Sequence, residues 1–116
     1  MGKQFHEQHA TINAFLDAEI PTLLALAEGV LHYRIDDQGL QAALWDLLEH
    51  WQSLGTKEGE PQHERERVFW LLVGLMSRHK PYRLRGHWAT KSILLQGMGY
   101  LRGDSAQAPT GPAPRP

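Results

Sequence analysis

Seven histidines are the residues in this sequence with the chemistry to bind a metal, and their spacing decides which of them can act together. His6 and His9 stand three residues apart, so a helix would place both imidazoles on one face, where they can chelate an ion. The second histidine comes one residue too early for the HExxH motif of metalloproteases. Carboxylate–histidine pairs at helical spacing are Glu28 with His32, Asp46 with His50, and Glu60 with His63. No pair is repeated as a di-iron bundle requires, so we expect no metal and no cofactor.

Covalent catalysis has little support in the sequence. The chain has no cysteine, which excludes a thiol nucleophile, a thiolate zinc site and a disulfide-stapled scaffold. Its serines lie in no G-x-S-x-G elbow, and Gly97-Met98-Gly99 does not extend to the G-x-G-x-x-G dinucleotide motif. We therefore assign no catalytic residue and favour a binding protein over an enzyme. A metal-binding helical bundle is the third interpretation.

Charge is divided unevenly along the chain. Residues 1–66 contain twelve acidic and four basic residues, whereas residues 67–116 contain one acidic and eight basic residues. The resulting charges of −8 and +7 nearly cancel, which gives the net charge of −1. An asymmetry of this kind between the two halves of a chain indicates an anionic partner for the basic half.

The basic half has its cations interleaved with aromatic residues between positions 78 and 91. The residues that we predict to bind a partner are Arg78, Lys80, Tyr82, Arg83, Arg85, Trp88 and Lys91. An acidic patch on a protein partner is the favoured ligand. The alternative is a nucleic-acid-binding module, in which the cations contact phosphates and the aromatic rings stack on bases. A further interpretation is that these cations face the chain's own acidic half and bind nothing.

A second interface is predicted around two tryptophans. The apolar segment from Val68 to Met76 forms a helix in which Trp70 and Gly74 share a back face, a bulky residue above a hollow. This face packs either within the chain or against a second copy, so a homo-oligomer is one of the outcomes. Trp45 is a secondary candidate because it lies at the edge of its helix's apolar stripe.

These candidate residues must be positioned by helices. Apolar residues recur at helical spacing in the segments 38–54, 62–79 and 87–102, and the segment from 4 to 32 is helical with Pro21 as a kink or a restart. We predict an all-α fold, a compact bundle of four to five helices over residues 1–103. Residues 104–116 contain four of the seven prolines and no large apolar residue, and are predicted to form a disordered tail.

The sequence also limits the location and class of the protein. The longest apolar run spans nine residues from Val68, well short of the ~20 that cross a bilayer, and no secretory signal is visible. We therefore expect no membrane association and a cytoplasmic location. The prediction as a whole is a small adaptor, accessory or regulatory protein that binds a protein partner.

Overall fold

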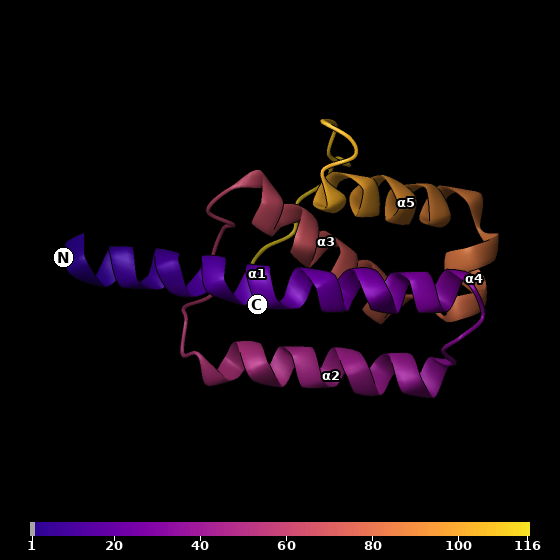
Figure 1. Ribbon diagram of the computed structural model, residues 1–116, viewed down its shortest axis with the longest axis horizontal. Helices are drawn as coiled ribbons and strands as arrows, with labels where there is room; N and C mark the ends of the chain where they lie inside the picture. The colour runs from indigo at the N-terminus through magenta and orange to yellow at the C-terminus, as the bar shows by residue number, and fades with distance from the viewer. Residues whose placement is uncertain (1) are drawn as a thin grey trace.

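The computed structural model describes residues 2–116, and the side chains from residue 7 onward. Within these residues the chain is all-α, as predicted, and contains no strand. The helices are α1 (Gly2–Leu31), α2 (Asp37–Ser53), α3 (Glu64–Arg78), α4 (Pro81–Gly86) and α5 (Trp88–Arg102). Figure 1 shows α1 along the longest axis of the molecule, with α2 on one side and α3, α4 and α5 on the other. No helix in the described part of the chain is long and apolar enough to cross a membrane.

Helix α1 packs against each of the other four helices, and it is continuous through Pro21. Proline removes one backbone donor and usually ends or kinks a helix. Here Pro21 lies on the exposed side, while Leu16 and Leu23 on either side of it are fully buried. Because apolar contacts hold the helix both before and after the proline, α1 does not restart there.

The other long helices begin and end close to the predicted positions because local signals mark their ends. Asp36 caps α2 by accepting a hydrogen bond from the Gly39 backbone N–H at 2.8 Å. His63 and His87 cap α3 and α5 in the same way, through ring nitrogens that accept from backbone N–H groups three residues ahead. Gly103 adopts the left-handed conformation, with a φ of 84°, and ends α5.

The core is centred on an aromatic cluster contributed by α1, α2 and α3. The ring of Phe15 lies between 5.0 and 5.9 Å from those of Trp51, Phe69 and Trp70, measured between centroids. Leucines at the i, i+4, i+7 positions of α2, beginning with Leu40, are also buried. Helical periodicity therefore identified the buried face of α2 correctly.

Residues 104–116 do not form the predicted disordered tail. They return along the molecule as an extended segment that ends beside α1 in Figure 1. Ala113 and Arg115 are buried, and the guanidinium of Arg67 donates to the carbonyl oxygens of Pro109 and Gly111. The composition of residues 104–116 predicted a solvated segment because these residues include no large apolar side chain. The structure corrects that prediction, since hydrogen bonds and a buried ion pair hold the segment instead.

Candidate functional site

Three of the predicted binding residues, Tyr82, Arg83 and Arg85, lie on α4, a short helix that the sequence did not reveal. Pro81 occupies its first turn, where the missing N–H is no loss, and Pro81 and Leu84 are buried against the bundle. Because these two residues anchor one side of the helix, Tyr82 and Arg83 point outward and are exposed. The segment between the predicted helices 62–79 and 87–102 therefore contains a helix of its own, anchored by Pro81 and Leu84.

The aromatic side chains of this region lie at the surface. Tyr82 is 70% exposed and Trp88 is 80% exposed. Arg78, Lys80, Arg83 and Lys91 are exposed as well, and Arg85 is half-buried. We call these seven residues the basic–aromatic surface. The structure thus leaves six of the predicted side chains accessible to a partner.

Part of the basic half is neutralised within the chain. Lys80 Nζ lies 3.0 Å from Asp37 Oδ2, and the side chain of Arg102 pairs with that of Glu28. In contrast, Arg78, Arg83 and Lys91 form no ion pair with any side chain that the structure describes. Their charges are accordingly available to an external anion.

Arg85 has a different role from the other cations. Its guanidinium carbon lies 4.1 Å from the centre of the Tyr33 ring, a cation–π contact between α4 and the end of α1. One of its terminal nitrogens, Nη1, donates to the Val30 carbonyl oxygen at 3.0 Å. Arg85 is therefore restrained by two contacts, and its other N–H groups form no hydrogen bond with the described residues.

Tyr33 has an unusual backbone conformation. Its φ of 59° is left-handed, and it is the one non-glycine residue in the described chain with a positive φ. It occupies the position after α1 at which glycine is usual, because the Arg34 N–H bonds back to the Gly29 carbonyl oxygen at 2.8 Å. The Tyr33 side chain is 78% exposed. Sequence reasoning missed this residue, since nothing in the segment from Val30 to Ile35 signals a left-handed tyrosine.

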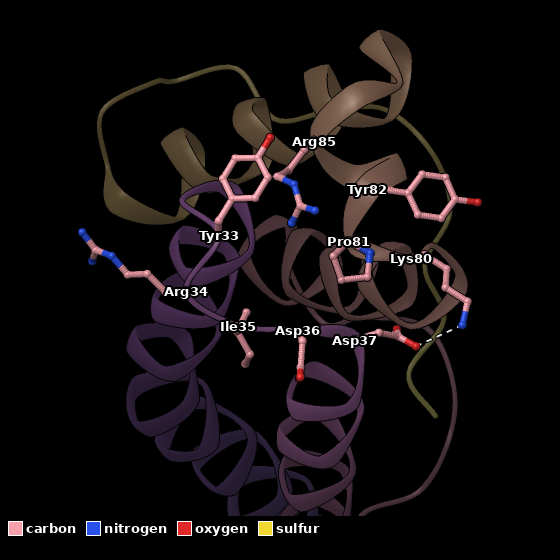
Figure 2. Close-up of a pocket in the computed structure, with 9 residues that line it drawn as sticks. All are labelled: Tyr33, Arg34, Ile35, Asp36, Asp37, Lys80, Pro81, Tyr82 and Arg85. Carbon is pink, nitrogen blue, oxygen red and sulfur yellow. Dashed lines mark hydrogen bonds and ion pairs between the residues drawn. The ribbon is translucent and has the colours of Figure 1, made fainter.

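An open cleft of about 620 Å³ lies between Tyr33 and the first turn of α4, and Arg85, further along α4, contacts Tyr33 at its edge. Figure 2 shows Tyr33 and Arg85 on one side of it, Tyr82 and Lys80 on the other, and Pro81 between them. Ile35, Asp36 and Asp37 lie below, at the start of α2. A second hollow, of about 500 Å³, shares Tyr33 and Arg85 and continues to Lys91 and Leu95 on α5. The contact between Tyr33 and Arg85 thus lies between two neighbouring hollows.

Of the two interpretations of the face with Trp70 and Gly74, packing within the chain holds for the tryptophan, which is therefore not an interface residue. Trp70 is 5% exposed, packs on Phe15 and Trp51, and donates its Nε1–H to Glu66 Oε2 at 2.9 Å. Its back face contacts the chain's own α1 and α2, because those helices enclose α3. Gly74 is half-buried beside the Arg78 side chain. Trp70 is therefore not accessible to a second copy of the chain.

Trp45 is 64% exposed, in agreement with its position at the edge of the apolar stripe of α2. Its Nε1–H donates to Glu49 Oε1 at 2.6 Å, one turn further along the helix. It lies on α2, away from the cleft residues, so the structure does not join it to the basic–aromatic surface.

The histidines are used as caps and ion-pair partners. His32 contacts Glu28 at 3.0 Å, whereas His50 contacts Glu19 rather than the predicted Asp46. The side chain of His6 lies outside the described residues, and its predicted pairing with His9 therefore lies outside them as well. Among the side chains from residue 7 onward, no three histidine or carboxylate groups converge on a metal position.

Two histidines have shifted pKa values. Burial lowers the pKa of His63, with the charges of Arg65 and His9 acting in the same direction and that of Glu66 opposing them. Burial likewise lowers the pKa of His79, and nearby Arg83 and Arg78 add to the shift. His79 is therefore neutral near pH 7 and adds no charge to the basic–aromatic surface.

The comparisons with known proteins identify no relative. No protein-family model matches the chain, and no curated protein or solved structure is significantly similar to it. Its function must therefore be inferred from the surface just described.

Proposed function

We propose that this protein acts by binding, as an adaptor, accessory or regulatory protein, and that its ligand is an acidic surface of a protein partner. The observation that supports this function best is the combination of unpaired cations with exposed aromatic rings. Arg83 and Lys91 form no ion pair within the described side chains, while Tyr82 and Trp88 are largely exposed beside them in the chain. Tyrosine, tryptophan and arginine are the residues enriched at protein interfaces.

The overall charge favours a protein over a nucleic acid as the ligand. A dedicated nucleic-acid-binding domain usually has a clear positive excess, whereas this chain has a net charge of −1. Lys80 and Arg102 are moreover paired with carboxylates of the chain. The remaining cations suffice to steer an acidic protein toward the surface without strong attraction to any polyanion.

An affinity capture experiment with a charge-neutral variant tests this function. The variant R83Q/K91Q removes two positive charges from the basic–aromatic surface. The control K57Q/R65Q removes the same charge from the loop before α3 and the first turn of α3, at the opposite end of the molecule in Figure 1. Arg65 pairs with Asp17 at an exposed position, and such pairs contribute little to stability. Immobilised wild type and both variants are exposed to nuclease-treated lysate, and a protein retained by wild type is then purified and titrated directly.

The expected result is a purified partner that binds wild type and K57Q/R65Q equally and binds R83Q/K91Q at least about tenfold more weakly, as for hot-spot residues. A partner that binds wild type, R83Q/K91Q and K57Q/R65Q with equal affinity would contradict the proposal. Binding of single- or double-stranded oligonucleotides at moderate salt, with log K falling as log[salt] rises at a slope of about −2 to −5, would favour the nucleic-acid alternative instead.

A further inference from the structure

We propose that the cleft between Tyr33 and α4 is the specific recognition site for an acidic segment of the protein partner, with Arg85 binding a carboxylate and the cleft floor taking an apolar side chain. The inference rests on the proposed function and deepens it. The centre of the proposed site is then the cleft, which is lined by residues 33–37 of the acidic half and residues 80–82 and 85 of the basic half. Residue Tyr33, outside the predicted segment, becomes part of the site.

The charges at the cleft favour an anionic ligand. Both carboxylates that line it have partners within the chain, since Asp36 caps α2 through Gly39 N and Asp37 pairs with Lys80. Arg85 has no carboxylate partner among the described side chains. Counted over its lining, the cleft has three cations, Arg34, Lys80 and Arg85, against the two carboxylates, which leaves an excess of one positive charge.

Arg85 is positioned before any ligand arrives. The contact of its guanidinium with the Tyr33 ring and the hydrogen bond from Nη1 to Val30 O restrict the side chain from two directions. Nη2 and Nε make no hydrogen bond to the described residues. A guanidinium fixed in this way loses little conformational entropy when a carboxylate binds, and its planar fork suits the two carboxylate oxygens.

The remainder of the cleft is suited to an apolar side chain. Pro81 is buried and Ile35 is half-buried, and together they line the cleft between the two tyrosines. Arg34 also lines the cleft, but Figure 2 shows its guanidinium extending away from the other lining residues, whereas the guanidinium of Arg85 points toward Pro81. A short peptide with an apolar residue between acidic residues matches this arrangement.

The backbone conformation of Tyr33 supports a role for its ring in ligand binding. A left-handed conformation is costly for a bulky residue, and glycine or asparagine would relieve the cost at this helix end. Tyrosine nevertheless occupies the position, with its ring against Arg85 and most of its surface exposed. Residues in strained backbone conformations cluster at ligand-binding sites, and the exposed face of the Tyr33 ring is open to a ligand.

The proposal is tested by titrating the full chain with a defined peptide. The probe is a blocked nine-residue peptide with Glu-Leu-Glu at its centre and glycine and serine elsewhere, and its control carries Gln-Leu-Gln. Binding is followed by ¹H–¹⁵N NMR shifts of assigned backbone amides. We expect saturable shifts at Tyr33, Arg34 and Arg85 with a Kd below about 1 mM, and no saturation with the glutamine peptide.

Three variants separate the role of the cleft from that of charge and stability. Y33N removes the ring at a position that asparagine tolerates, so the melting temperature is expected to hold or rise while affinity falls about tenfold. R85Q and R34Q remove the same charge at neighbouring positions, one inside the cleft and one directed away from it. We expect R85Q to weaken binding about tenfold and R34Q to weaken it less than about threefold.

Several outcomes would overturn the cleft assignment. Equal binding of the glutamate and glutamine peptides would exclude carboxylate recognition, as would tighter binding of a deoxythymidine oligonucleotide at the same amides. Shifts confined to Arg83, Trp88 and Lys91 would refute the cleft but leave the proposed function in place. Absence of peptide binding would also refute the cleft, and the capture experiment would then decide the proposed function by itself.

Discussion

The guanidinium of Arg115 binds both carboxylate oxygens of Glu66, a residue 49 positions earlier in the chain. Nε lies 2.8 Å from Oε2 and Nη2 lies 3.0 Å from Oε1, and both side chains are buried. The Glu66 carboxylate also accepts hydrogen bonds from Trp70 Nε1 and from the Gln62 backbone N–H. Burial raises the pKa of Glu66, but these hydrogen bonds, with that from Arg115 first among them, outweigh burial and hold the pKa below its ordinary value.

Arg115→Ala should therefore destabilise the fold strongly, because it leaves a buried carboxylate without its cation. Removal of one partner from a buried ion pair typically costs about 3–5 kcal/mol. The matched control is Arg102→Ala, which breaks the more exposed pair with Glu28 and should cost less than about 1 kcal/mol. Urea unfolding of both variants measures the difference. Similar losses in the two variants would show that the C-terminal segment does not stabilise the core.

Substitution by alanine should destabilise the fold strongly at Trp70 and hardly at all at Trp88. Trp70→Ala removes a ring packed among Phe15, Trp51 and Phe69, so we expect a loss of about 3–5 kcal/mol in unfolding free energy. Trp88→Ala removes a ring that is 80% exposed, and the expected change is within about 0.5 kcal/mol. Chemical denaturation followed by circular dichroism provides the measurement. A stable, folded Trp70→Ala protein would contradict the buried position of this ring.

Gly97→Ala should be destabilising even though alanine is the better helix former. A Cβ atom at Gly97 would lie 2.6 Å from Leu72 Cδ2, and Leu72 is fully buried, so its side chain has little room to move. Overpacking of this kind costs about 1–3 kcal/mol. Gly99→Ala is the control in the same helix, since its Cβ would lie 3.9 Å from the nearest atom. That variant should be neutral or stabilised by up to about 1 kcal/mol, as judged from thermal unfolding.

His63 should make the stability depend on pH near neutrality. Its Nδ1 accepts from the Glu66 backbone N–H at 3.2 Å and its Nε2–H donates to Asn13 Oδ1 at 2.9 Å, an arrangement that requires the neutral ring. Because folding lowers the pKa of His63, the unfolded chain binds the proton more readily, and stability falls as pH drops below the ordinary value of 6.5. The effect of Glu66 comes at lower pH, below its ordinary value of 4.5.

His63→Asn tests this assignment, because asparagine keeps a cap acceptor that does not titrate. We expect the variant to match wild type within about 1 kcal/mol at pH 7.5 and to lose less stability between pH 7 and pH 5. His79, whose pKa is also lowered, retains some dependence in the same range. Parallel unfolding curves for the two proteins at both pH values would contradict a neutral cap at His63. Unfolding free energies from urea titrations at each pH supply the comparison.

The sequence by itself determined the four long helices and much of the buried surface. The α2 leucines and Trp51 follow a 3.6-residue period and are buried, and Asp36 caps this helix as expected. Helix α3 ends at Arg78, close to the predicted end at residue 79. These features depend on residues within a turn or two of each other, so local spacing is enough to predict them.

The tertiary structure alone decided which distant residues meet. Trp70 is a core residue because α1 and α2 enclose it. Arg115 is buried because it forms an ion pair with the buried carboxylate of Glu66. Tyr33 became part of the candidate site because α4 places Arg85 against its ring. Each of these contacts joins positions far apart in the chain, and their free energies depend on burial and orientation. Neither quantity exists until the helices have packed.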